Sequence, residues 1–242
     1  LLYTENDYTP GMYYLGDRKG KFLRPILEQY PALVPEVLTE HQFVTYTTRD
    51  GTELEGYLTL PLNADGPVPA ILHPHGGPSA RESDGFDYWT SFFANRGYAV
   101  FRPNFRGSSG YGYEFAQSQM KGWGLTMQDD LTDAANWLVE QKIAKPDGIC
   151  IVGASYGGYA AAMAAVKTPG LFKCAVSFAG VTNLKQLVSR SRGYTNSKFV
   201  KNQIGNDSDD LEARSPYYQA EKVNIPMLFL HGADDRVVDV EQ

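Results

Sequence analysis

The sequence predicts an α/β protein with a doubly wound, mostly parallel sheet, and three observations lead to this class. From Phe43 onward, short apolar segments typical of strands alternate with segments of helical character, as in sheets joined by right-handed crossovers. A short apolar run and an alanine-rich run flank a glycine-containing turn at 153–157. The 242 residues, 43% hydrophobic and 21% charged, suit one large globular domain.

The first 36 residues differ from the rest, since they are rich in Tyr, Gly and Pro and have no helical period. Residues 11–17 predict a strand that leads into a turn, and Pro25, Pro31 and Pro35 predict a linker. An isolated hairpin is marginal in water. This stretch is therefore expected to be an extension or the end of a preceding β-domain.

The main domain is expected to begin with a hairpin, because strands at 43–48 and 53–60 flank the turn Arg49-Asp50-Gly51. Further strands are expected at 70–73, 98–102, 149–152, 172–178 and 227–230, and helices at 89–95, 127–141 and 160–166. Residues 182–222 predict a polar, irregular stretch. In doubly wound sheets the site lies at the carboxyl ends of the strands, so the loops after them are expected to carry function.

Charge and hydropathy exclude several function classes. The net charge of −6 and the lack of a basic stripe argue against nucleic acid as a partner. No apolar run approaches the roughly 20 residues of a membrane span. No signal peptide is visible, but the chain begins without Met and is expected to be a piece of a longer one. The compartment therefore stays open, with the cytoplasm favoured.

Cys150 and Cys174 both fall in apolar, strand-like runs. We expect them to be free thiols that pack as small hydrophobes, with a disulfide between them as the alternative. Neither has the spacing of a metal site, and the sequence indicates no metal and no cofactor.

The Ser155 region carries the clearest catalytic pattern. Residues 153–157 form Gly-x-Ser-x-Gly between a strand and a helix, the pattern of a nucleophile elbow. Gly153 and Gly157 let so sharp a turn close, because a Cβ there would collide with the neighbouring strand and helix. The turn would hold Ser155 at a helix N-terminus, where N–H groups stabilise an oxyanion. The alternatives are a plain strand-to-helix turn or a phosphate loop, whose Gly-Lys-Ser/Thr ending is absent.

The loop His73-Pro74-His75-Gly76-Gly77-Pro78 follows the strand at 70–72. An elbow hydrolase needs two oxyanion donors, the N–H after the nucleophile and one from an earlier loop. We assign the first to Tyr156 and the second to Gly77, with Gly76 as the alternative.

The four histidines are expected to have supporting roles. His73 and His75 form a His-x-His pair without a nearby cluster of carboxylates or cysteines, which is weak for a metal site, so both are expected to hold the loop. His75 would also border the oxyanion site. His41 lies in a linker and is expected to be solvated, whereas His231 ends a strand and should point into the sheet.

Arg106 lies in the loop after the strand at 98–102. Its guanidinium is a candidate clamp for a substrate carboxyl or carbonyl. The alternative, which we favour, is that Arg106 ties loops together through backbone carbonyls. Asp129, Asp130 and Asp133 on the following helix are expected only to complement the macrodipole.

Asp234 and Asp235 follow the strand at 227–230. In the chain order Ser, Asp, His, the acid follows a strand later than the nucleophile strand, fixes the tautomer of the histidine and stabilises its imidazolium. Either aspartate fits this role or that of a turn residue. No histidine follows Asp235, so the chain alone is expected to be nearly inactive.

Together these motifs resemble the prolyl oligopeptidase family of serine peptidases, nearest to the acylaminoacyl-peptidase and dipeptidyl-aminopeptidase branch. The resemblance covers residues 40–242 and rests on 75–78, 104–112, 123–124, 153–159, 215–216 and 231–242. It implies that Asp235, four residues after His231 and three before Val238, is the acid. It also implies that the catalytic histidine lies beyond Gln242.

The resemblance further implies an α/β-hydrolase catalytic domain over 37–242, with its C-terminal end missing, and the end of a β-propeller with a linker over 1–36. The activity it implies is cleavage of short peptides by acyl transfer from Ser155. A carboxylesterase of the same fold and a non-catalytic binding module are the alternatives. Exopeptidase and endopeptidase activity, side-chain preference and the presence of a homo-oligomer stay open.

Overall fold

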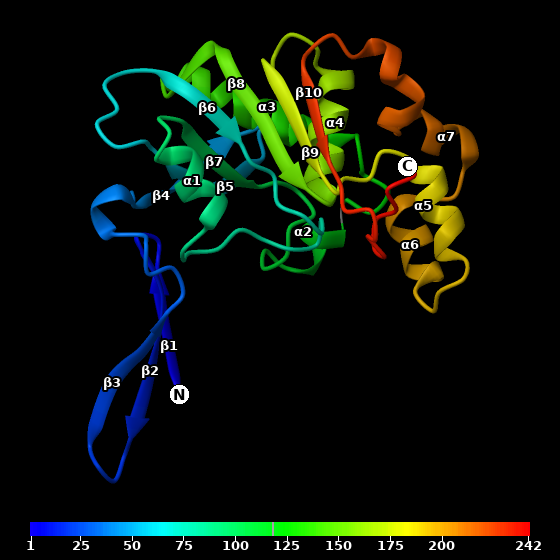
Figure 1. Ribbon diagram of the computed structural model, residues 1–242. Coiled ribbons are helices and arrows are strands. Elements are labelled where there is room, and N and C mark those ends of the chain that lie inside the picture. The colour runs from blue at the N-terminus through cyan, green and yellow to red at the C-terminus, as the bar shows by residue number, and fades with distance from the viewer. Residues whose placement is uncertain (118) are drawn as a thin grey trace.

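The structure is a computed structural model that describes residues 1–117 and 119–242 (Figure 1). Its main sheet has the strand order β10-β9-β8-β6-β7-β5-β4. The strands are β4 (His41–Thr47), β5 (Glu53–Thr59), β6 (Val68–Leu72), β7 (Ala99–Asn104), β8 (Ala144–Ala154), β9 (Cys174–Phe178) and β10 (Met227–Leu230). The strands from β7 to β10 in this order run parallel, while β4 and β5 form an antiparallel hairpin. The predicted α/β class and mostly parallel sheet are confirmed.

The helices connect these strands and fill the region before β10. They are α1 (Tyr88–Ala94), α2 (Tyr113–Gln117), α3 (Thr126–Glu140), α4 (Tyr156–Lys167), α5 (Leu184–Ser191), α6 (Ser197–Ile204) and α7 (Ser208–Ala213), with 3-10 turns η1 (Pro35–Val37) and η2 (Pro216–Lys222). Within the described residues, no helix combines the length and apolarity needed to cross a bilayer.

The expectation of an irregular stretch at 182–222 is wrong, because α5, α6, α7 and η2 lie there. Side-chain caps begin two of these helices. The Asn183 side chain accepts a hydrogen bond from the N–H of Gln186, and the Asp207 side chain accepts one from the N–H of Asp210. Such caps satisfy N–H groups that have no partner inside the helix, so they favour even short polar helices.

The N-terminal residues form a separate antiparallel sheet of β1 (Leu2–Asn6), β2 (Thr9–Asp17) and β3 (Phe22–Glu28). Figure 1 shows this sheet projecting from the body of the molecule. The predicted strand at 11–17 lies within β2, but Pro25 is not part of a linker, because it lies in β3 opposite Tyr14. β3 is an edge strand, where a residue without an N–H is tolerated.

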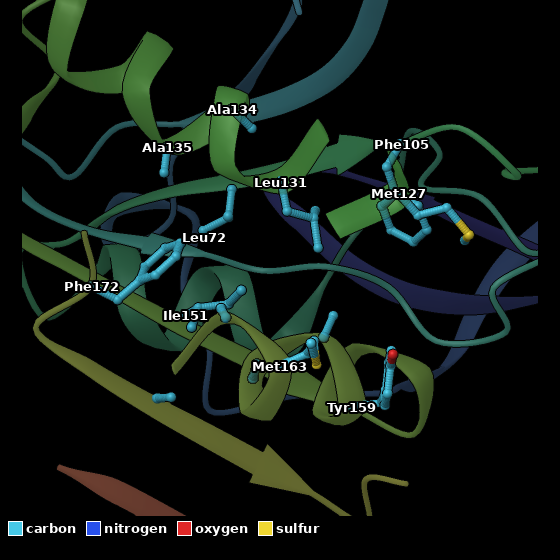
Figure 2. Packing of buried hydrophobic residues seen from close by; sticks show 14 of the residues in the cluster. Leu72, Phe105, Met127, Leu131, Ala134, Ala135, Ile151, Tyr159, Met163 and Phe172 are labelled. Carbon is cyan, nitrogen blue, oxygen red and sulfur yellow. The ribbon is translucent and has the colours of Figure 1, made fainter. Parts of the chain in front are cut away.

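The core lies on both faces of the main sheet. The larger cluster joins the sheet to α3 and α4 and includes Leu131, Ile151 and Met163, which Figure 2 shows between helix and strand. On the opposite face, Ile71, Val100 and Val152 pack with aromatic residues of α1. This two-sided cover holds β6, β7 and β8 rigidly, and their carboxyl ends carry the loops described below.

Cys150 and Cys174 form a disulfide, so the expectation of two free thiols is wrong. The two residues lie directly opposite each other in the parallel pairing of β8 with β9. Side chains at paired positions of adjacent strands point to the same face. The two cysteines are 24 residues apart in sequence, and the register of β8 with β9 brings their sulfurs together.

Candidate active site

Ser155 lies between the end of β8 and the first residue of α4, with φ 56° and ψ −120°. A positive φ is rare outside glycine and marks a strained turn. The Ser155 N–H donates a hydrogen bond of 2.9 Å to the carbonyl of Phe178 at the end of β9. The serine is thus fixed at the carboxyl edge of the sheet and at the N-terminus of a helix.

Gly153 and Gly157 occupy places with no room for a side chain. A Cβ at Gly153 would lie 2.4 Å from the carbonyl carbon of Gly157, and one at Gly157 would lie 2.2 Å from the carbonyl oxygen of Pro74. The clashing atoms belong to the backbone in both cases, so no side-chain rearrangement relieves the clash. These contacts bring the strand, the helix and the loop after β6 together around Ser155.

The glycine loop after β6 lies against the serine. A Cβ at Gly76 would be 3.5 Å from the Cβ of Ser155 and 4.0 Å from its Oγ. Gly77 follows with φ 119°, a conformation that favours glycine. On the other side, Tyr156 begins α4 and is fully buried. The two N–H groups assigned to the oxyanion, those of Gly77 and Tyr156, therefore belong to the two segments that flank Ser155.

His75 is buried in this loop and bonded at both ring nitrogens. Its Nδ1 lies 2.7 Å from the carbonyl oxygen of Gly76 and its Nε2 lies 2.8 Å from the Oγ of Ser108. Burial lowers the pKa of His75 to about 4, so the ring is neutral at pH 7. A carbonyl only accepts, so Nδ1 carries the proton of the neutral ring and donates to Gly76. The Ser108 hydroxyl beside Nε2 also lies 2.7 Å from the carbonyl oxygen of Phe105, to which it can donate.

His73 also holds the loop. Its Nδ1 is 2.5 Å from the carbonyl oxygen of Val152, and its ring stacks on Trp89 of α1 with centroids 5.5 Å apart. Each loop histidine thus lies within hydrogen-bond distance of a backbone carbonyl, that of Val152 for His73 and that of Gly76 for His75.

The low pKa of His75 predicts a loss of stability in mild acid. The unfolded chain takes up a proton near the ordinary histidine pKa of about 6.5, whereas the folded protein resists protonation down to about 4. The free energy of unfolding should therefore fall by about 3 kcal/mol, through this residue, as the pH drops from 6.5 to 4. Urea unfolding at several pH values measures this dependence. In the His75→Gln variant, the free energy of unfolding should depend less steeply on pH between 6.5 and 4, by the uptake of about one proton. The same pH dependence as in the wild type would contradict the neutral, buried state of His75.

Arg106 and Asp130 form a buried pair beside the site. The Nε of Arg106 is 3.0 Å from both carboxylate oxygens of Asp130, whose side chain is wholly buried, and Nη1 contacts Asp50. The expectation that Arg106 bonds backbone carbonyls is wrong, because its partners are carboxylates. Burial raises the pKa of Asp130, and the hydrogen bonds from Arg106 oppose that rise. Asp130 therefore anchors the 105–108 loop to α3.

The macrodipole explanation for the α3 aspartates is also incomplete. Asp133 accepts from the N–H and Nε of Arg49 in the β4–β5 turn, and Asp129 lies 3.0 Å from the Nζ of Lys167. Each aspartate of the first two turns of α3 thus joins that helix to another segment. No local sequence pattern predicts these partners, because they lie 24 residues or more away along the chain; the smallest separation is that of Arg106 and Asp130.

Asp235 lies in the loop after β10. Its Oδ1 accepts hydrogen bonds from the N–H groups of Val237 and Val238, at 2.8 and 3.0 Å, and these bonds lower its pKa. Its Oδ2 is 3.5 Å from the Nε2 of His231, which also contacts the carbonyl of Val238 at 2.8 Å. The aspartate is therefore a carboxylate at neutral pH, with one oxygen directed at an imidazole.

His41 does not lie in a solvated linker, so that expectation is wrong. It belongs to β4, its side chain is 7% exposed, and its Nε2 is 3.0 Å from the Oδ1 of Asp84. The backbone N–H of His41 donates a hydrogen bond to the Oδ2 of Asp7 in the β1–β2 turn. In residues 1–117 and 119–242, no group of three His, Cys, Asp or Glu side chains is arranged to hold a metal ion.

Comparison with known proteins identifies the family. Residues 85–242, more than half of the chain, match the prolyl oligopeptidase family. Dipeptidyl aminopeptidase BIII of Pseudoxanthomonas mexicana is 38% identical over 241 residues, which cover 93% of this chain and 35% of that protein.

Two solved structures superpose on nearly the whole chain. A puromycin-hydrolyzing peptidase of Mycobacterium tuberculosis matches with a TM-score of 0.87 at 26% identity, covering 99% of this chain and 38% of that one. The acylaminoacyl peptidase of Pyrococcus horikoshii matches with a TM-score of 0.83 at 26% identity, covering 99% and 39%. The chain thus spans little more than a third of the length of these relatives. It belongs to the prolyl oligopeptidase family.

Proposed function

We propose that the complete protein is a serine peptidase that cleaves short peptides by acyl transfer, with Ser155 as the nucleophile. The observation that carries this proposal is the strained Ser155 turn at the N-terminus of α4, with the Gly76-Gly77 loop packed against it. A helix N-terminus and a nearby glycine loop supply backbone N–H groups where an oxyanion would form. The names of the relatives, a dipeptidyl aminopeptidase and an acylaminoacyl peptidase, support peptides as the substrate class.

The proposed reaction has two stages. A histidine removes the proton from the Ser155 hydroxyl as its oxygen attacks the peptide carbonyl carbon, and the N–H groups of Tyr156 and Gly77 hold the resulting oxyanion. The carbon–nitrogen bond then breaks, and the same histidine gives the proton to the leaving amine. Water, activated by that histidine, releases the acyl group from Ser155 in the second stage.

Asp235 is the proposed acid that orients this histidine. β8, β9 and β10 are parallel neighbours, so the loops carrying Ser155 and Asp235 leave the sheet at the same edge. The lowered pKa of Asp235 supports the charged form that the role requires.

We place the catalytic histidine beyond Gln242. The four histidines of this sequence already have other contacts: His41 with Asp84, His73 with Val152, His75 with Ser108 and His231 with Val238. The greater length of the relatives is consistent with a longer protein.

We further propose that residues 1–36 are the end of a β-propeller with a linker and that 37–242 belong to the catalytic domain. The separate antiparallel sheet of β1, β2 and β3 supports this division, since it shares no strand with the main sheet. A three-stranded sheet that projects from the body gains a larger apolar environment when it is part of such a domain.

A fluorophosphonate probe tests the proposed nucleophile directly. The complete protein should react with one equivalent of probe, and mass spectrometry of its peptides should locate the adduct on Ser155. Turnover of dipeptidyl anilides, acylaminoacyl anilides and aryl esters then defines the substrate class. An adduct elsewhere would contradict the assignment of Ser155, and faster turnover of aryl esters than of every peptide would favour a carboxylesterase.

A further inference from the structure

The ring of Phe105 contacts both segments that carry the proposed oxyanion donors. It stacks on His75 with centroids 4.4 Å apart and planes 17° apart, and on Tyr156 with centroids 5.5 Å apart and planes 30° apart. Phe105 and Tyr156 are fully buried, and His75 is 8% exposed. One flat side chain therefore lies between the glycine loop after β6 and the first residue of α4.

His75 transmits its position to the Gly77 N–H through a single peptide group. Its Nδ1–H donates to the carbonyl of Gly76, and that carbonyl belongs to the same trans peptide as the Gly77 N–H. In a trans peptide the C=O and the N–H point in opposite directions. A ring that holds the carbonyl therefore aims the N–H away from itself, and the tilt of the His75 ring sets that direction.

Phe105 has its own supports, which do not depend on the elbow. The carbonyl of Phe105 accepts from the N–H of Ser108, and the N–H of the next residue, Arg106, donates to Asp130 of α3 at 2.9 Å. Figure 2 shows Phe105 and Met127 at one end of the core cluster, with Phe172 at the other. The backbone that carries the Phe105 ring is thus bonded to α3, and not to the two segments that the ring stacks against.

We propose that Phe105 is a positioning residue of the oxyanion hole: its ring fixes the separation and tilt of His75 and Tyr156, and through them the two N–H donors. This inference rests on the proposed function of Ser155. Hydrogen bonds to an oxyanion act in the transition state rather than on the bound substrate, so a displaced donor lowers kcat more than it raises KM.

The test replaces the ring by aliphatic side chains in the complete protein. Phe105→Leu should lower kcat about 10- to 100-fold, with KM changed less than about 2-fold, because small displacements of catalytic groups have effects of this size. Binding of a peptide aldehyde, whose tetrahedral adduct places an oxygen in the hole, should weaken by a similar factor. Phe105→Met, an unbranched side chain that fits irregular spaces, gives the same comparison where the leucine variant does not fold.

Phe101→Leu is the matched control. Phe101 is equally buried and contacts the rings of Tyr46 and Trp137, away from the elbow. The Phe101→Leu substitution should lower the melting temperature yet leave kcat per fluorophosphonate-labelled site unchanged. A Phe105 variant whose kcat per labelled site and aldehyde affinity match the wild type would overturn the proposal. If the wild-type protein is not labelled at Ser155, that result would instead contradict the proposed function, and this inference would fail with it.

Discussion

Replacing Ser155 by alanine should lower kcat for peptide substrates by about 10⁶ in the complete protein. The substitution removes the oxygen that is proposed to form the acyl-enzyme and leaves the proposed donors, the N–H groups of Tyr156 and Gly77, in place. Those donors alone would still stabilise the attack of water, so a residual rate above the uncatalysed one is expected. Initial rates on the best anilide substrate, together with loss of fluorophosphonate labelling, measure the effect.

Ser109→Ala provides a control for this substitution. The N–H of Ser109 donates to the carbonyl of Ala80, and alanine retains that bond. Its kcat should stay within about 2-fold of the wild type, as is usual for a change outside the site. If Ser155→Ala kept most of the activity, the nucleophile would have to be a different residue.

Asp235→Asn should lower kcat by about 10⁴, because an amide neither fixes the required histidine tautomer nor stabilises the imidazolium. The Asn side-chain oxygen can still accept from Val237 and Val238, so the loop conformation should be retained. The low pKa of Asp235 implies that the wild-type residue stays ionised throughout the neutral range. Steady-state kinetics at pH 7 to 8 measure the loss.

The adjacent Asp234 offers a matched control, since it is exposed and precedes Asp235 in the same loop. Asp234→Asn should change kcat less than about 2-fold. The opposite pattern, with a large loss at Asp234 and none at Asp235, would transfer the role of the acid to the neighbouring aspartate.

The sequence predicts those parts of the fold and site that depend on short-range patterns. The elbow around Ser155 is one example, because the glycines that permit its turn lie two residues away on either side. The β4–β5 hairpin is another, since its Asp-Gly turn specifies it locally. The alternation of strands and helices is equally local, and it predicted the main sheet.

Features that depend on distant partners could not be predicted in this way. Asp130 has the pattern of an ordinary helix-start acid, and only the fold brings Arg106 to it. The stack of Phe105 on His75 has no counterpart in sequence spacing. The helices α5 and α7 are an intermediate case, because their caps Asn183 and Asp207 are visible in the sequence while both helices are short and mostly polar.

The disulfide between β8 and β9 has a consequence for the covalent structure of the site. Residues 150–174 form a closed ring, and Ser155, Tyr156 and all of α4 lie inside it. A protease cut at any single bond in this ring would leave both new ends attached to the rest of the polypeptide. The segment that carries Ser155 and the neighbouring strand β9 are therefore covalently linked twice, once through the backbone and once through the disulfide.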